Sequence, residues 1–211
     1  MTDIYRPMEI EAESFRIIEE EIRQMGRQVP EVYASVIRRV IHTTADFSYL
    51  DSMYFSPHVM EAAKEALRRG SNVITDTNMA KAGVNKSALK RLGGEVLCYM
   101  ADEEVAKLAG QRQITRAWIS MERSALSGED MIYVIGNAPT ALLAIVKLAA
   151  EGKIRPRFVI GAPVGFVNVT EAKEQLIASG IPCIVPRGRK GGSNVAAAIL
   201  NALLYEVAGR G

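Results

Sequence analysis

The second half of the chain alternates short apolar runs with longer segments of helical composition. Runs rich in β-branched residues occupy 131–136, 157–165 and 182–188, and they predict strands. The segments between and after them end in glycine, a common helix stop, and predict helices over 137–152, 170–180 and 191–209. Strands that are apolar throughout and alternate with helices are typical of a parallel sheet covered on both faces.

The first half continues this pattern with less regular spacing. Apolar runs predict strands at 72–75 and 95–100. The last helical segment before residue 131 contains Gly110, near which we expect a break. The helices predicted in this half span 13–25, 30–42, 56–70, 76–83, 85–93 and 102–128.

Polar residues at helix starts are candidate N-caps. Ser56 precedes Pro57, a favoured residue of the first helical turn. Thr170 is expected to open the 170–180 helix, with Lys173 and Glu174 on its polar side. The last helix has Ser193 or Asn194 as its expected cap.

The whole pattern predicts one α/β domain over residues 1–211. We expect a doubly wound, mostly parallel sheet with helices on both faces and an N-terminal helical arm. No internal repeat, low-complexity segment or linker interrupts it.

Composition narrows the class of protein. The formal net charge is only +2 and the basic residues are scattered, so the nucleic-acid-binding stripe of a basic protein is missing. No apolar run approaches the roughly 18 residues of a membrane helix, and the acidic N-terminus is unlike a signal peptide. Cys98 and Cys183 lie far apart and lack metal-ligand spacing, which predicts reduced thiols in a cytoplasmic protein without a metal site.

Ligands of open parallel sheets bind beyond the carboxyl ends of the strands, so the loops there supply candidate site residues. In GNAPTA, a helix is expected to begin near Pro139, and free N–H groups at a helix start attract anions. RGRKGGS (187–193) adds three cations and three glycines. Neither segment matches a phosphate-binding fingerprint, and both also fit ordinary turn and capping chemistry. The candidates are Asp76, Thr77, Met79, Asn137, Ala138, Pro139, Thr140, Arg189 and Lys190.

His42 ends the helix predicted over 30–42. Helical periodicity places it away from the apolar face that contains Val36 and Val40, in the last turn, where the helix dipole favours a cation. Two interpretations remain open at this point. His42 is either a surface histidine that closes the helix or an imidazolium offered to a substrate.

Several segments are more informative about the protein family in combination than separately. In chain order they are ESFRII, RVIHTTADF, DTNMAKAGV, ITRA, VIGNAPTAL, VIGAPVGFVNVTEAKEQL and RGRKGGSNVAAAILNAL. With these segments, from about Tyr5 to Leu204, the chain closely resembles the precorrin-8X methylmutase family, which includes the cobalt-precorrin-8 methylmutases of cobalamin biosynthesis.

The resemblance implies an activity and a set of partners. It implies an intramolecular methyl shift from C11 to C12 of a tetrapyrrole (corrinoid) macrocycle, which gives hydrogenobyrinate or its cobalt form, cobyrinate. It also implies a homodimer with the tetrapyrrole bound near the subunit interface, and neither a redox cofactor nor a methyl donor. Whether the natural substrate carries cobalt is left open by the sequence.

The resemblance also assigns residues. The family's histidine matches His42, whose implied role is proton donor to the ring system. Its Ser-Phe and Thr-Arg pairs match 14–15 and 115–116, and Arg116 is implied to bind a substrate carboxylate. With the loop candidates and the neighbouring polar groups, the predicted substrate-binding set is Ser14, Phe15, Arg16, Thr43, Asp76, Thr77, Met79, Arg116, Asn137, Ala138, Pro139, Thr140, Arg189 and Lys190.

Two other function classes are alternatives to the isomerase. One is a corrinoid-binding or carrier protein that holds the tetrapyrrole without turnover. The other is a nucleotide-binding α/β enzyme, which the missing phosphate fingerprint disfavours.

Overall fold

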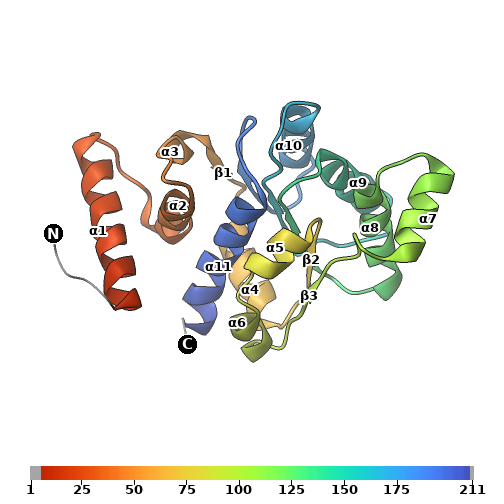
Figure 1. Ribbon diagram of the computed structural model, residues 1–211, viewed down its shortest axis with the longest axis horizontal. Coiled ribbons are helices and arrows are strands. Elements are labelled where there is room, and N and C mark those ends of the chain that lie inside the picture. Colours follow the sequence, from red (N-terminus) through yellow and green to blue (C-terminus); the bar gives the residue numbers. More distant parts are fainter. Residues whose placement is uncertain (1–5, 210–211) are drawn as a thin grey trace.

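The structure, a computed structural model, describes residues 6–209 and contains a six-stranded sheet (Figure 1). The strand order is β1-β6-β5-β4-β2-β3, and the neighbouring strands are parallel except for the antiparallel pair of β1 and β6. The predicted mostly parallel α/β sheet is therefore confirmed. The strands are β1 (Met53–Phe55), β2 (Val73–Thr75), β3 (Val96–Leu97), β4 (Ile132–Ile135), β5 (Phe158–Gly161) and β6 (Cys183–Pro186).

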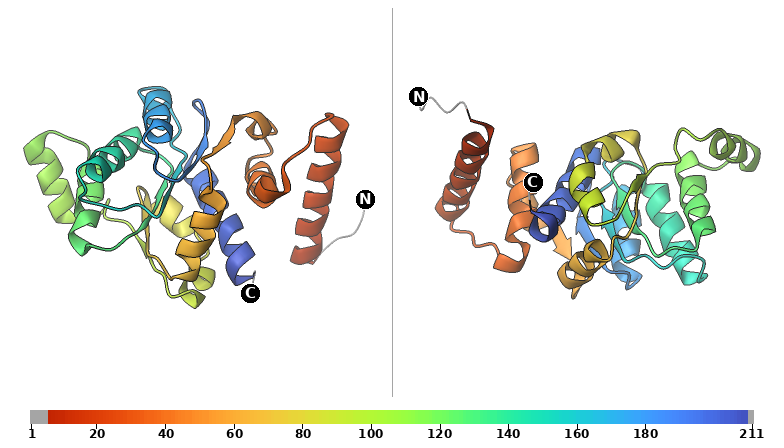
Figure 2. Two further views of the ribbon diagram at one scale, coloured as in Figure 1. Left: turned by 180° about the vertical axis from the view of Figure 1, so that it is seen from behind. Right: turned by 90° about the horizontal axis from the view of Figure 1, so that it is seen from below.

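Helices cover both faces of this sheet, as expected (Figures 1 and 2). One face packs against α4 and α11, with α2 and then α1 further out, and the other face packs against α8, α9 and α10. The α-helices are α1 (Pro7–Gln24), α2 (Glu31–Thr44), α3 (Tyr49–Ser52), α4 (Val59–Arg68), α5 (Asn78–Gly83), α6 (Lys86–Arg91), α7 (Glu103–Arg112), α8 (Arg116–Ser124), α9 (Pro139–Ala150), α10 (Val169–Ala178) and α11 (Ser193–Ala208).

Strand β4 shows why the strands are recognisable as continuous apolar runs. Ile132 and Val134 belong to the core shared with α2, α4 and α11, whereas Tyr133 and Ile135 belong to the core under α8 and α9. All four side chains are buried. Because alternate residues of a strand face opposite sides, a strand covered on both faces needs apolar side chains at every position.

The N-terminal arm consists of α1 and α2. Helix α1 stands at the outer end of the molecule and contacts the rest mainly through α2 (Figure 2). Ile18 and Ile22 are its buried residues, and ion pairs join Arg39 to Glu11 and Arg38 to Glu19. Helix α2 packs in turn along α11, so the arm is continuous with one core of the sheet.

Strand lengths differ from the sequence prediction. Strand β1 was not predicted, because its three residues lie between a short helix and Ser56 and are too few to show a period. Strands β3 and β5 are shorter than the expected 95–100 and 157–165. For β5 the reason is local, since Pro163 follows its end and has no N–H to donate to a neighbouring strand.

Three predictions about helix ends were wrong. Ser56 does not cap α4: its hydroxyl accepts a hydrogen bond from the Cys183 N–H, and the helix begins after His58, which has a positive φ of 59°. The last helix begins after Gly192, so neither Ser193 nor Asn194 is its N-cap. Helix α10 begins at Val169, one residue before Thr170.

The break expected near Gly110 falls three residues later. Helix α7 runs through Gly110 to Arg112, and its C-cap Gln113 has a left-handed backbone conformation with a φ of 50°. Thr115 then caps α8, and its hydroxyl accepts a hydrogen bond from the Trp118 N–H. A glycine inside a helix is tolerated, so the capping residue decides where the helix ends.

Ala45, at the C-cap of α2, provides a stability test. Its φ of 52° places a side chain where glycine is favoured. Ala45→Gly should raise the free energy of unfolding by about 0.5–1 kcal/mol. The left-handed strain that it removes from the folded state is larger than the entropic cost of ordering a glycine on folding. Chemical denaturation measures this. The control Ala12→Gly, at an exposed position inside α1, should instead lower stability by up to about 1 kcal/mol. A loss in both variants would contradict the strain argument.

Candidate functional site

The carboxyl ends of β2 and β4 form the topological switch point of the sheet. From β2 the chain builds β3 on one side, and it later returns to build β4 on the other side. The loops after β2 and β4 therefore diverge at this point, where open α/β sheets commonly bind ligands. The predicted residues Asp76 and Thr77 follow β2, and Asn137 and Ala138 follow β4.

A carboxylate of the protein itself fills this switch point. The Asp76 side chain accepts hydrogen bonds from the backbone N–H groups of Gly136, Asn137 and Ala138 at N···O distances of 2.8, 2.9 and 2.6 Å. Asp76 is completely buried. Burial raises the pKa of its carboxyl group, and the three N–H donors act in the opposite direction.

These contacts involve two groups that the sequence predicts at the substrate site. The N–H groups at the start of α9 are not free to hold a substrate anion, because Asp76 already accepts their hydrogen bonds. Asp76 itself has no exposed surface in this structure. Its role in this structure is to fix the 136–138 loop at the start of α9.

The start of α11 meets the same region. The hydroxyls of Thr77 and Ser193 are 2.7 Å apart, and the Thr77 hydroxyl also caps α5 by accepting a hydrogen bond from the Ala80 N–H. Gly136 packs so closely that a Cβ there would lie 2.6 Å from the Ser193 Cα. The predicted Met79 is 71% exposed on α5, and the side chain of the predicted Asn137 is exposed as well.

The 187–192 loop joins β6 to α11 and contacts the arm. Lys190 Nζ lies 2.6 Å from an Asp46 carboxylate oxygen and 2.8 Å from the Ser48 hydroxyl. These contacts hold the pKa of Asp46 down at about 2, with Lys190 as the largest cause. Lys190 was expected to be available for a substrate carboxylate, but in this structure it is paired with Asp46, four residues after His42. Arg189 lies over the exposed Phe166 ring, 5.4 Å from its centroid.

His42 lies in the last turn of α2 and is exposed, so the prediction that it lies off the apolar face is confirmed. Its ring stacks on Phe15 with the centroids 5.1 Å apart and an angle of 26° between the planes. The other predicted residues of this region make local bonds. Ser14 donates to the Ile10 carbonyl, Arg16 bonds to Glu13, and Thr43 donates to the Arg39 carbonyl.

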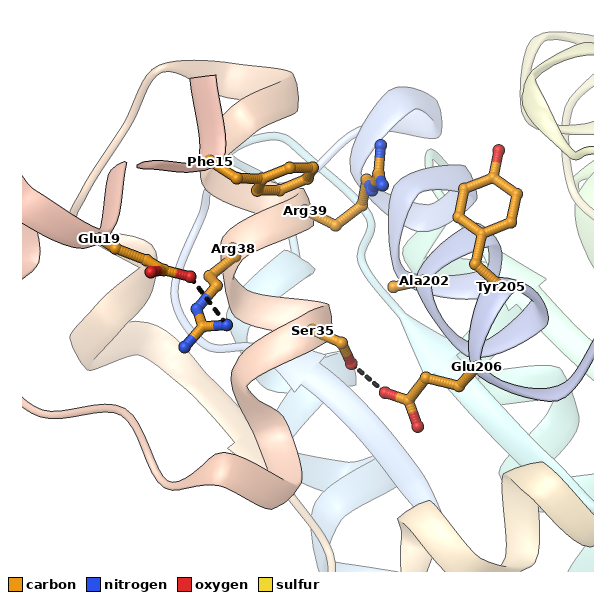
Figure 3. A pocket seen from close by; sticks show the side chains of 8 residues that line it. All are labelled: Phe15, Glu19, Ser35, Arg38, Arg39, Ala202, Tyr205 and Glu206. Atoms are coloured by element: carbon orange, nitrogen blue, oxygen red, sulfur yellow. Dashed lines mark hydrogen bonds and ion pairs between the residues drawn. The ribbon is translucent and has the colours of Figure 1, made fainter. Parts of the chain in front are cut away.

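Two cavities lie along α2 and α11 near His42. One, of about 350 Å³, is bordered by Phe15 of α1, and Figure 3 shows the side chains around it. The other, of about 270 Å³, is bordered by Thr43. Arg39 and Tyr205 line both cavities, and the Arg39 guanidinium lies 4.8 Å from the Phe15 ring centroid and 5.2 Å from that of Tyr205.

Arg39 and Tyr205 were not among the predicted site residues. The spacing of Arg39, three residues before His42 on one helix, is a signal that could have identified it. Tyr205 is distant in the sequence and has no such signal. Arg39 also forms an ion pair with Glu11 of α1, and its side chain is only 12% exposed.

Arg116 belongs to a second group of predicted residues. It is exposed at the first position of α8, next to Thr115, whose hydroxyl is 2.8 Å from that of Thr140 on α9. Pro139 precedes Thr140 at the helix start. Helices α8 and α9 cover the face opposite to α2, so one chain holds Arg116 and His42 on different sides of the sheet.

Within residues 6–209, no three His, Cys, Asp or Glu side chains are grouped so that they could hold a metal ion. No helix in this part of the chain has the length and apolar character needed to cross a membrane.

The fold and the site define a class, an open α/β protein with an exposed histidine and clustered cations at the carboxyl edge of its sheet. The model of the precorrin-8X methylmutase family matches residues 9–206. A cobalt-precorrin-8 methylmutase of Salmonella typhimurium is 43% identical over 97% of each chain. A precorrin-8X methylmutase of Pseudomonas aeruginosa is 36% identical over 92% of this chain and 93% of its own.

Solved structures agree with the sequence matches. The crystal structure of the precorrin-8X methylmutase from Thermus thermophilus superposes with a TM-score of 0.85 and 39% identity, covering 94% of this chain and 97% of the other. The chain belongs to the precorrin-8X methylmutase family.

Asp76→Asn tests the contact at the switch point. An amide has one acceptor oxygen and places an NH₂ group against the remaining N–H donor. We expect the free energy of unfolding to fall by about 2 kcal/mol and Tm by about 4–8 °C. Asp102→Asn is the matched control, because asparagine is an equally good cap for α7 and the partly exposed ion pair of Asp102 with Arg123 contributes at most about 1 kcal/mol. Equal Tm values for the Asp76 variant and the parent would contradict the structural role of Asp76.

Proposed function

We propose that this chain moves a methyl group from C11 to C12 of precorrin-8 or its cobalt form, in cobalamin biosynthesis, with His42 as the proton donor. Family membership supports the reaction, since precorrin-8X methylmutases are isomerases that transfer a methyl group within one molecule. One structural observation supports the proposed role of His42 as proton donor. Its imidazole is exposed at the end of α2 and stacks on Phe15, which borders one of the two cavities.

The reaction requires no covalent bond between the protein and the substrate. A methyl group that migrates within one ring system needs no protein nucleophile. It needs an acid held at the ring and a surface that binds a large, flat polycarboxylate. One positioned acid contributes about 10²–10⁴-fold, and the remainder comes from orientation and from tighter binding of the rearranging state.

The groove along α2 and α11 is the surface that we propose for the macrocycle. Phe15 offers an aromatic face beside His42, and Arg39 offers a guanidinium between two rings. Arg189 is an exposed cation that can pair with a carboxylate at the periphery of the ring. Arg116 lies on the other side of the sheet, so we propose that it reaches the ring from the second subunit of the proposed homodimer. Thr43 is proposed as pocket lining, because it borders the smaller cavity.

His42→Ala tests the acid. We expect the variant to bind hydrogenobyrinate as the parent does but to lose about 10²–10⁴-fold in kcat, measured by the spectral change of methyl migration. The matched control is His58→Asn, which removes the other histidine and suits its left-handed backbone. Both the metal-free and the cobalt-containing substrate should be assayed, because the relatives bear names for both. Full turnover by His42→Ala would refute the acid role, and binding without turnover by the parent would favour the carrier alternative.

We also propose a homodimer, a cytoplasmic location and a single domain. Exposed apolar side chains on the 163–168 loop support the dimer, since Phe166 and Val167 are 82% and 77% exposed and Val164 is 46% exposed. Clustered exposed apolar groups are typical of interaction surfaces. The single six-stranded sheet supports one domain. The cytoplasmic location rests on the sequence alone.

Sedimentation at micromolar concentration tests the dimer. The parent should sediment as a dimer, and Phe166→Asp should shift it toward monomer, because a charge would be buried in the contact. Leu126→Asp is the control, since Leu126 is equally exposed at 83% but lies before β4, at the opposite edge of the sheet. A strictly monomeric parent would contradict the dimer. A dimeric Phe166→Asp variant would contradict this loop as its interface.

A further inference from the structure

Lys173 is a completely buried lysine on α10. The sequence predicted it on the polar side of that helix, and the structure shows that this was wrong. Buried lysines are rare unless they are paired with an opposite charge. Within residues 6–209, no carboxylate lies within ion-pair distance of its ammonium group.

The Lys173 ammonium instead holds the 187–192 loop. Its Nζ donates hydrogen bonds to the carbonyl oxygens of Gly188 and Lys190, each 2.8 Å away. With these carbonyls turned toward α10, the side chains of Arg189 and Lys190 are exposed on the outside of the loop. Lys190 then reaches Asp46, directly after the helix that carries His42.

The backbone of the loop has little freedom around these two bonds. Gly191 has a positive φ, and a Cβ there would lie 2.3 Å from the carbonyl oxygen of Ala162. The Gly192 N–H donates to that same oxygen, and the Gly165 N–H donates to the Arg189 carbonyl. Lys173 thus fixes a loop that is already packed against its neighbour.

Around this loop, positively charged side chains outnumber the carboxylates that pair with them. Arg187 pairs with Glu174, and Lys190 pairs with Asp46. Lys173 and Arg189 have no carboxylate of residues 6–209 within ion-pair distance. The remaining charged groups of α10 and of α9, which packs against it, are Glu171, which is exposed, and Lys147 with Glu151 at the end of α9, which pair with each other.

We propose that Lys173 is a positioning residue for the methyl shift: its buried ammonium holds the 187–191 loop beside the His42 end of α2 and attracts a carboxylate of the ring substrate to that loop. This inference rests on the substrate site proposed above. A buried charge without a counter-ion costs stability, and a ligand carboxylate supplies the missing counter-charge. Lys173 does not touch the reacting atoms in this scheme, so its effect falls on binding more than on kcat.

The pH dependence separates this role from a merely structural one. Burial lowers the pKa of Lys173 to about 8, while the nearby Glu174 opposes the shift. Above pH 8 the folded protein loses this proton, whereas the unfolded chain keeps it up to about pH 10.4. The unfolded state then binds more protons, so this group makes the free energy of unfolding rise with pH. Substrate affinity should fall over the same range, because the attracting charge is lost.

The test uses hydrogenobyrinate, the metal-free product, as the probe. For the parent we expect its dissociation constant to be flat up to about pH 7.5 and then to rise, by at most about tenfold per pH unit. Lys173→Met should raise the dissociation constant and KM about tenfold or more at pH 7, change kcat much less, and abolish the rise above pH 8. Lys107→Met, an exposed lysine on α7, is the control of equal charge and should behave as the parent does.

The possible outcomes are distinct. A parent that neither binds hydrogenobyrinate nor turns over substrate would overturn the proposed function and this inference with it. A parent that is active but has a pH-independent dissociation constant would overturn the inference alone. A folded Lys173→Met variant with unchanged KM would do the same. The parent titration needs no variant, so it decides the question even if Lys173→Met fails to fold.

Discussion

The structure depends on one buried carboxylate at the switch point of its sheet. Asp76 accepts three backbone N–H groups at the start of α9, where many α/β proteins hold the anion of a ligand. Asp76 thereby occupies the N–H donors that a ligand anion would otherwise use at this point. The groove proposed for the substrate lies between α2 and α11 instead, and one of its two cavities is bordered by Asn194 at the start of α11.

Other charges at this edge are also paired within the protein, but more loosely. The Lys190–Asp46 pair has side chains that are 57% and 30% exposed, and Arg187 and Glu174 are similarly open to solvent. Exposed ion pairs contribute about 0–1 kcal/mol, so a substrate carboxylate can replace one at little cost. The three hydrogen bonds to Asp76 cannot be exchanged in this way, because the carboxylate is buried. Burial therefore separates the groups that hold the fold from those that can be recruited by a ligand.

The sequence predicted the sheet and its faces well, because strands covered on both sides are apolar at every position, as β4 shows. Periodicity alone also placed His42 on the exposed side of α2. The part played by Asp76 could not be predicted, since a carboxylate after a strand has the same sequence pattern whether it faces a ligand or the protein. Lys173 was missed for a related reason: a polar residue on an amphipathic helix is expected at the surface. Tyr205 joins the site only through tertiary packing.

The placement of His42 follows from contacts at both sides of its helix. His42 is on the arm and not on the sheet, so its position relative to the carboxyl edge depends on how α2 is held. Arg39 joins α2 to α1 through Glu11, and Asp46 joins its end to the 187–192 loop through Lys190. That loop is held in turn by Lys173 and by the start of α11, where Ser193 contacts Thr77, the neighbour of Asp76. A continuous series of contacts therefore connects the buried carboxylate at the centre of the sheet with the exposed imidazole. The acid role proposed for His42 needs such support, since a displacement of about 1 Å can cost a hundredfold in rate.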